Sequence, residues 1–293
     1  MNKKDSAPSA KELRQIDAFL PKEMARRAED IGVKKASLPT GKMFSLAILA
    51  GAFIALGAVF ATTVTAGAAG QIPFGITKLL GGIAFSLGLI LVVVAGAELF
   101  TGNNLAVMAL ASGKITLGKL LRGWIIVYFG NFVGSVATAV VVFFSRQYEQ
   151  GAGIVGQNAL AIANAKCQLD LVQAFGLGVL CNGLVCLAIW LCYSARSTTD
   201  KILSIIFPIT AFVAAGFEHS VANMYFISIG LFIKSGASAG FWKSSEVGAS
   251  SYSAITWENF LITNLVPVTL GNIVGGAFMV GLVYWFIHLR NHE

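Results

Sequence analysis

The sequence predicts an all-α membrane protein whose six membrane segments form an inverted repeat of three plus three. Three observations support this prediction: an apolar composition, a succession of long apolar runs, and matching motifs in the two halves of the chain. Hydrophobic residues make up 56% of the 293 residues and charged residues 12%, and the mean hydropathy is +0.75. A soluble domain carries about 25% charged residues, so the composition indicates a chain that lies mostly in lipid.

Charged residues gather at the start of the chain. Residues 1–42 hold ten of the 21 Lys and Arg, which predicts a polar N-terminal segment over residues 1–42, a six-segment membrane domain over residues 43–290 and a short tail over residues 291–293. The start of the chain has no short apolar run with a cleavage site, so we expect no cleaved signal peptide. An N-terminus in the cytoplasm puts sixteen basic residues inside and five outside. The positive-inside rule then favours both termini in the cytoplasm.

Four apolar runs predict uninterrupted membrane helices. A helix that crosses the bilayer core needs about 20 apolar residues. Four runs satisfy this need with almost no charge, namely residues 43–66, 123–145, 171–195 and 266–289. The last run is free of charge except for His288, which stands at its end. These runs predict segments one, three, four and six.

The other two runs, residues 79–112 and 202–233, are too long for one ordinary span and too short for two spans with a turn. The first contains one charged residue, Glu98, and the second contains the adjacent pair Glu218 and His219. Two half-helices around a short irregular stretch fit this length. Because lipid offers no hydrogen-bond partner to the backbone, such a stretch must be buried in protein or line a cavity. Segments two and five are therefore predicted to be broken.

The two broken segments carry the same pattern. Gly, Glu and Asn stand at the first, third and eighth positions of each pattern, as Gly96, Glu98 and Asn103 and as Gly216, Glu218 and Asn223. A second match relates segments three and six, as Gly130, Asn131 and Gly134 and as Gly271, Asn272 and Gly275. Three spans per repeat force the halves into opposite orientations. Such inverted repeats are typical of transporters and channels, in which broken helices line a solute path at the repeat interface.

Ionisable side chains inside membrane segments are costly and usually functional, and this chain has three: Glu98, Glu218 and His219. Histidine is the one that titrates near neutral pH. His219 either bonds a carbonyl as a buried histidine or donates a hydrogen bond, or a proton, to an anion in the path, and we favour the second. The two glutamates either cap free backbone amides of the broken helices or contact the solute, and we favour the first.

Uncharged residues beside the breaks are further candidates. Thr101, next to Gly102 and Asn103, either bonds its own loop or faces His219 across the path. Large apolar residues near the breaks form either core packing or constrictions that gate by dewetting; they are Phe85, Leu89, Leu99, Phe100 and Phe212. Lys166, just outside segment four, either keeps a loop soluble or attracts anions.

Within the polar segment, Pro21 suits the first position of a helix. Met24, Ala28 and Ile31 then fall on one face, with charges opposite. This pattern predicts an amphipathic helix on the cytoplasmic surface, either an interfacial anchor or a lid over the path.

Other functional classes lack support in the sequence. The four cysteines have no zinc or disulfide spacing, and we expect small buried residues, no metal and no cofactor. No aromatic–basic motif indicates nucleic acid. A membrane-embedded enzyme would need a convergent nucleophile, metal cluster or cofactor motif, so we expect none. A water or glycerol channel would need paired Asn-Pro-Ala motifs, and neither break contains proline.

The motifs around Glu98 and Glu218 resemble those of the formate/nitrite transporter family. The resemblance runs over essentially the whole chain and includes residues 127–131, 185–196 and 265–276. Within the family the chain is most similar to the formate channels. The pair Asn103 and Asn104 stands where some formate channels have Ser or Thr, which weakens formate slightly against nitrite.

The resemblance implies an aquaporin-like subunit with its own pore, assembled as a homopentamer in the inner membrane. It implies that the loop at residues 98–103 is flexible and that its Thr101 faces His219. By position, Leu89 and Leu99 resemble the residues of the family's cytoplasmic constriction, with Phe100 beside them. Phe85 and Phe212 resemble the residues of its periplasmic constriction. The remaining pore positions resemble an anion-attracting vestibule and two pore amides, namely Lys166, Asn182 and Asn272.

The resemblance therefore implies passive, bidirectional and pH-dependent passage of formate. A bare carboxylate in an apolar constriction loses several kcal/mol of hydration, and a proton from His219 would turn it into neutral formic acid. Thr101 and Asn272 would orient it. Nitrite, hydrosulfide and acetate are alternative anions, and a neutral solute fits the residues less well. The family alone suggests a cytoplasmic formate-producing enzyme as a partner of the N-terminal segment.

Overall fold

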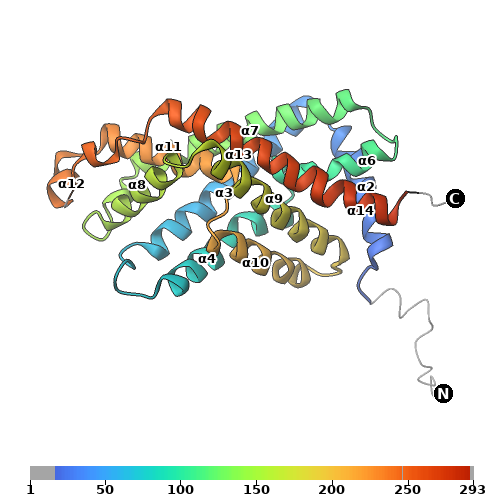
Figure 1. The fold of residues 1–293 in the computed structure, drawn as a ribbon, viewed down its shortest axis with the longest axis horizontal. Coiled ribbons are helices and arrows are strands. Elements are labelled where there is room, and N and C mark those ends of the chain that lie inside the picture. Colours follow the sequence, from blue (N-terminus) through green and yellow to red (C-terminus); the bar gives the residue numbers. More distant parts are fainter. Residues whose placement is uncertain (1–16, 246, 291–293) are drawn as a thin grey trace, which may run out of the picture.

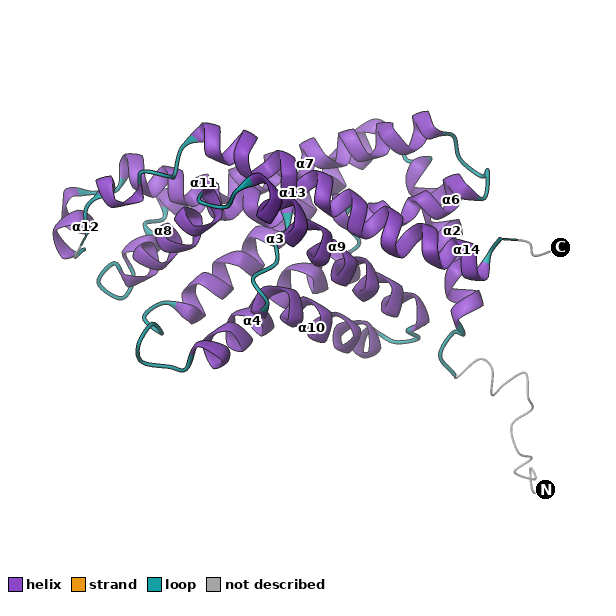
Figure 2. Ribbon diagram, in the orientation of Figure 1, coloured by secondary structure: helices purple, strands orange, loops and turns teal. Residues whose placement is uncertain are grey.

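The computed structural model describes residues 17–245 and 247–290, so the predicted tail at residues 291–293 lies outside the described residues. Within the described ranges the chain consists of helices joined by short loops and contains no strand (Figure 2), which confirms the all-α class. In chain order the elements, with η for 3₁₀ turns and for the π-helical η4 and η5, are α2 (Pro21–Ala36), α3 (Thr40–Thr65), α4 (Phe74–Ala95), α5 (Phe100–Asn103), η1 (Asn104–Ala106), α6 (Val107–Ala111), α7 (Leu117–Phe144), η2 (Gln147–Glu149), α8 (Ile154–Cys167), α9 (Leu171–Ser194), α10 (Thr198–Ala214), α11 (Ser220–Gly236), α12 (Ala239–Ser244), η3 (Ala249–Tyr252), η4 (Asn259–Leu265), α13 (Val266–Ile273), η5 (Val274–Leu282) and α14 (Val283–His288).

Five helices in the described part of the chain are long and apolar enough to cross a membrane: α3, α4, α7, α9 and the continuous final helix Asn259–His288. We expected half-helices in both interrupted runs. In the first run this is wrong for the helix before the break, because α4 has 22 residues. The predicted run at residues 202–233 is divided between α10 and α11, which have 17 residues each. Each of these two helices is shorter than the roughly 20 residues of an ordinary span. The chain at this position therefore enters and leaves the interior as two shorter helices.

The two halves of the chain pack in the same way. α3 packs against α4 and α7, α9 packs against α10 and α13, and α4 packs against α10 between the halves (Figure 1). Gly134 of α7 and Gly275 of η5 allow the close approach, because a Cβ atom there would overlap the carbonyl oxygen of Ile48 or of Val179. The matched glycines of the sequence repeat thus lie at matched helix crossings.

Each half also begins with a helix outside its spans. α2 precedes α3 as α8 precedes α9, and Figure 1 shows α2 with α14 at one end of the molecule and α8 with α12 at the other. The predicted amphipathic helix is α2, which has Met24 and Ala28 buried against the core. The buried Glu29 of this helix accepts a hydrogen bond from Lys114 in the loop before α7. α2 is thereby tied to the body of the protein.

The sequence patterns gave no expectation of α8. This helix has only 14 residues and contains polar side chains such as Asn158, so it lacks the long apolar run that predicts a span. Its last turn contains Lys166, which we had expected in a loop. That expectation is wrong, and the helix gives the lysine a fixed position.

Candidate functional site

The first break in the helices follows α4. Gly96 ends that helix in a left-handed conformation with φ 83°, which glycine adopts without the strain that a Cβ atom would cause. The chain runs on in non-helical conformation to Leu99, and α5 begins at Phe100. The backbone N–H of Glu98 donates to the carbonyl oxygen of Leu46 at 3.2 Å, so α3 supports the irregular stretch.

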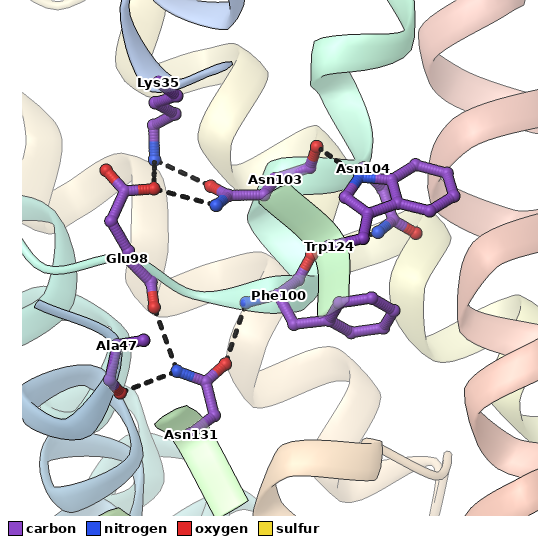
Figure 3. Close-up of polar contacts among 8 residues, drawn as sticks. All are labelled: Lys35, Ala47, Glu98, Phe100, Asn103, Asn104, Trp124 and Asn131. Carbon is purple, nitrogen blue, oxygen red and sulfur yellow. Dashed lines mark hydrogen bonds and ion pairs between the residues drawn. The ribbon is translucent and has the colours of Figure 1, made fainter. Parts of the chain in front are cut away.

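Asn131 of α7 bonds the backbone of this break (Figure 3). Its Oδ1 atom accepts from the N–H of Phe100 at 2.9 Å. Its Nδ2 atom donates to the carbonyl oxygens of Ala47 at 2.8 Å and Glu98 at 2.9 Å. One buried side-chain amide therefore satisfies two backbone groups that the break leaves free, as burial requires, and bonds a carbonyl group of α3 as well.

The second break, after α10, repeats this arrangement. Gly216 has φ 73°, and the N–H of Glu218 donates to the carbonyl oxygen of Leu177 at 3.2 Å. Asn272 accepts from the N–H of Ser220 at 2.9 Å and donates to the carbonyl oxygens of Gly178 and Glu218 at 2.8 and 3.0 Å. Asn131 and Asn272 thus perform the same task in the two repeats.

Each break also contains a buried carboxylate paired with a lysine and an asparagine. Glu98 Oε2 lies 3.0 Å from Lys35 Nζ and 2.7 Å from Asn103 Nδ2, and Lys35 Nζ lies 2.7 Å from Asn103 Oδ1 (Figure 3). The lysine comes from the last turn of α2, the leading helix of the first half. The pair is electrically neutral, which offsets the cost of burying either charge alone.

The second carboxylate has the equivalent partners. Glu218 Oε1 lies 2.7 Å from Lys166 Nζ, and its Oε2 atom lies 2.6 Å from Asn223 Nδ2. Lys166 stands in the last turn of α8, the leading helix of the second half. The inverted repeat therefore places one lysine–glutamate–asparagine group at each break.

Two of our expectations need correction. The glutamate side chains do not cap the free backbone amides, because the asparagines Asn131 and Asn272 do so while the carboxylates bond lysine and asparagine. The amide of Asn272, which we expected to face the path, is fully buried and bonds three backbone groups. It has no hydrogen left to offer a solute.

The two breaks meet at Thr101 and His219, whose Oγ1 and Nε2 atoms lie 2.9 Å apart in the buried interior. The Nδ1 atom of His219 accepts from the backbone N–H of Ala222 at 3.0 Å, as the N-terminal cap of α11. A neutral imidazole has one donor and one acceptor nitrogen. The ring hydrogen is therefore assigned to Nε2, which donates to the Thr101 hydroxyl, and that hydroxyl keeps its own hydrogen for another acceptor.

Polar groups behind Thr101 hold its backbone in place. Asn182 Nδ2 lies 3.3 Å from the carbonyl oxygen of Thr101 and 2.6 Å from that of Asn272, and Cys186 Sγ lies 3.4 Å from the Thr101 oxygen. Gly276 lies beside these groups, where a Cβ atom would overlap the Asn182 amide. Asn182 thus connects the backbone at Thr101 to that of α13, whose Asn272 side chain bonds the second break.

Two cavities approach the Thr101–His219 pair from opposite ends. The larger cavity, of about 850 Å³, is lined among others by Lys166, Phe85, Phe212 and His219. The rings of Phe85 and Phe212 pack edge to face with centroids 5.7 Å apart, and the Phe212 ring stacks on His219 at 5.9 Å. The expected aromatic pair therefore lies directly beside the histidine.

The smaller cavity, of about 250 Å³, lies at the end where α2 packs. It is lined among others by Lys35, Leu99, Gly102 and Asn103. Thr101, Leu89 and Phe100 line neither of these two cavities and are buried. The Phe100 ring packs against two aromatic rings of α7, with centroids 5.0 Å from that of Tyr128 and 6.2 Å from that of Trp124.

The described residues contain no group of three or more His, Cys, Asp or Glu side chains that could hold a metal ion. Two residues of the site were absent from our expectations. Lys35 lies in the polar segment, and no local pattern relates it to Glu98. Asn131 could have been found, because its repeat position matches that of Asn272.

A chain of apolar helices whose two broken segments meet at a buried polar pair between opposed cavities defines the class of membrane channels and transporters. Within that class, the chain belongs to the formate/nitrite transporter family, whose model matches residues 22–286.

Relatives and solved structures are similar over nearly their whole length. The formate channel FocA of Escherichia coli (strain K12) is 47% identical over 95% of this chain and 97% of its own. FocA of Haemophilus influenzae is 44% identical over 90% and 93%. A solved pentameric formate channel with formate bound gives a TM-score of 0.81 at 48% identity, covering 86% of this chain and 98% of that one. An FNT family ion channel gives 0.75 at 30% identity, over 90% and 98%.

Proposed function

We propose that this protein is a channel for formate, with one pore through each subunit and the Thr101–His219 pair at its centre. The observation that carries the proposal is this buried pair of donors between two opposed cavities, at the meeting point of the two breaks. The relatives named as formate channels support the choice of substrate. The solved pentameric formate channel supports a pentamer.

The path favours a small anion that gains a proton. A bare carboxylate that leaves water for an apolar section loses several kcal/mol, and the section beside His219 is bounded by Phe85 and Phe212. At the pair, a formate oxygen accepts from the free hydroxyl hydrogen of Thr101, and the His219 ring holds that hydroxyl in place. The hydrogen bond replaces part of the lost hydration.

The observed ring geometry changes the expected duty of His219. Nδ1 accepts from the Ala222 N–H, so a second ring proton would have to displace that bond. If the neutral ring lost its Nε2 hydrogen it would become an imidazolate anion, so the neutral ring does not act as an acid at neutral pH. We infer that His219 acts as a neutral hydrogen-bond donor. The proton that accompanies formate then comes from water in the cavities.

This mechanism has no energy input, so the formate and proton gradients set the direction and passage is bidirectional. Flux rises as pH falls, because a larger share of formate then carries a proton. We place the protein in the inner membrane with both termini in the cytoplasm, on the charge asymmetry of the chain. In this orientation the larger cavity faces outward and the smaller cavity faces the cytoplasm.

Solute entry into proteoliposomes tests the proposal. Swelling or stopped-flow uptake is measured with formate, nitrite, hydrosulfide, acetate and glycerol, with protein-free liposomes as the control. We expect formate to enter fastest among the anions and glycerol to enter no faster than in the control. Rapid glycerol entry, or nitrite entry without formate entry, would reject a formate channel.

A further inference from the structure

The larger cavity contains two lysines but only one carboxylate. Among its described lining residues, the charged side chains are Lys78, Lys166 and Glu218. Lys78 stands in the first turns of α4, and Lys166 in the last turn of α8. The charges of these three side chains sum to one positive charge. The lysine that is not paired with Glu218 carries this excess charge.

The ammonium group of Lys166 is already paired with a carboxylate. Its Nζ atom lies 2.7 Å from the buried Glu218 carboxylate, over the ring of Phe226 at 5.5 Å, and its side chain is 15% exposed. If Lys166 turned to an anion in the cavity, it would leave the Glu218 carboxylate buried without a cation, which is strongly unfavourable. Lys166 therefore has little free charge to offer.

Lys78 has no such partner. Within the part of the chain that the structure describes, no carboxylate lies within 4.0 Å of its ammonium group. The group lies over the ring of Phe74 at 5.4 Å from its centroid, and Phe74 is exposed. A cation–π contact at an exposed ring is weak, so the ammonium group can leave it for an anion.

We propose that Lys78, and not the paired Lys166, is the residue that binds the incoming small monovalent anion in the larger cavity. This inference rests on the proposed function and on the orientation that puts the larger cavity outside. In it, Lys78 raises the local concentration of the anion by its unpaired charge. The Lys166–Glu218 pair then serves to hold the second break in place.

Uptake of formate into proteoliposomes, measured against formate and salt concentration, tests this assignment. Removing a unit charge a few ångströms from the anion in a wet site changes its binding about threefold to tenfold. We expect Lys78→Gln to raise the half-saturating formate concentration by that factor and to reduce its dependence on salt. Lys78→Arg keeps the charge and stays close to wild type. Lys243→Gln, an exposed lysine outside the cavity lining, is the matched control.

A second variant separates charge from folding. In Lys78→Cys, an aminoethyl thiosulfonate reagent restores a positive charge on the introduced thiol, and the native cysteines are all buried. We expect the reagent to restore the wild-type half-saturation in the same protein sample. Unchanged half-saturation and salt dependence in Lys78→Gln would overturn the assignment, and so would salt-dependent weakening in Lys166→Gln alone.

The two proposals can fail separately. If wild type conducts no formate, the proposed function fails, and the same comparison is made with nitrite as the flux probe. If wild type conducts formate and Lys78→Gln matches Lys243→Gln, only the assignment of Lys78 fails.

Discussion

Thr101 and His219 lie 118 positions apart in the chain and 2.9 Å apart in the structure, Oγ1 to Nε2. Each residue comes from the break of one repeat, so the pair exists only because the two halves pack against each other. The Ala222 N–H fixes which ring nitrogen donates. The pair thus presents one free hydroxyl hydrogen where the two breaks meet.

The Thr101 hydroxyl is predicted to be needed for passage. Thr101→Val keeps the shape and removes the donor. A hydrogen bond to a charged group contributes about 1.5–3 kcal/mol, so we expect formate uptake to fall about tenfold or more. Uptake by proteoliposomes measures this, with Thr101→Ser as the control that retains the hydroxyl. Wild-type uptake in the valine variant would exclude a direct contact.

Asn131 and Asn272 are predicted to stabilise the fold equally. Asn131→Leu and Asn272→Leu each leave one N–H and one carbonyl group of a break without their side-chain partner. Each buried unsatisfied group costs about 1–3 kcal/mol, so both variants should show a clearly lower midpoint of thermal unfolding in detergent. Asn158→Leu, whose amide is only partly buried, serves as the control and should lose less. A large difference between the unfolding midpoints of Asn131→Leu and Asn272→Leu would contradict the equivalent roles of the two asparagines.

Lys35 is predicted to stabilise the fold through its ion pair with Glu98. Lys35→Met leaves the buried carboxylate without a cation, and breaking a buried pair in this way costs about 3–5 kcal/mol. We expect a smaller loss, because the Lys35 side chain is 30% exposed. The double variant Lys35→Met/Glu98→Gln should recover part of the lost thermal stability. No recovery in the double variant would mean that Lys35 acts through packing alone.

The Lys114–Glu29 contact between α2 and the loop before α7 is predicted to weaken in alkali. The hydrogen bond to the Glu29 carboxylate raises the pKa of Lys114 above its ordinary value. A raised pKa in the folded state means that this contribution is complete below the ordinary lysine pKa of about 10.4 and is lost as pH rises through the raised value. The protection of the α2 amides, expressed as the intrinsic exchange rate at each pH divided by the measured rate, should therefore stay constant through neutral pH and fall above that value.

Lys114→Gln is the matching variant, since it leaves the buried Glu29 without its cation. It should show faster exchange in α2 already at neutral pH and no alkaline step of its own. An alkaline step of the same size in the variant would assign the effect to other groups.

Much of the fold followed from the lengths of apolar runs. The all-α class, the four long spans and the position of the glutamate motifs were predictable, because a bilayer demands about 20 apolar residues per helix. α8 was not, since its 14 residues include polar side chains and need not cross the membrane. The repeat motif led to Glu98 and Glu218 but assigned them the capping that Asn131 and Asn272 perform.

The site was predictable only where motifs marked it. Thr101 and His219 stand inside the break motifs, and their expected proximity agrees with the distance between them. Lys35 and Lys78 stand in no motif, because their positions depend on how α2 and α4 pack in three dimensions. The neutral state inferred for His219 depends on the Ala222 N–H, which is a feature of backbone geometry.

The neutral-donor duty of His219 is tested most directly by formate flux into proteoliposomes as a function of external pH, for wild type, His219→Gln and His219→Phe. Glutamine keeps an N–H donor and does not titrate, whereas phenylalanine has no donor. We predict that the formate flux of His219→Gln stays within about threefold of wild type and still rises as pH falls. The flux of His219→Phe should be mostly lost. A glutamine variant that conducts formate without any dependence on pH would contradict this account, because the ring itself would then supply the proton.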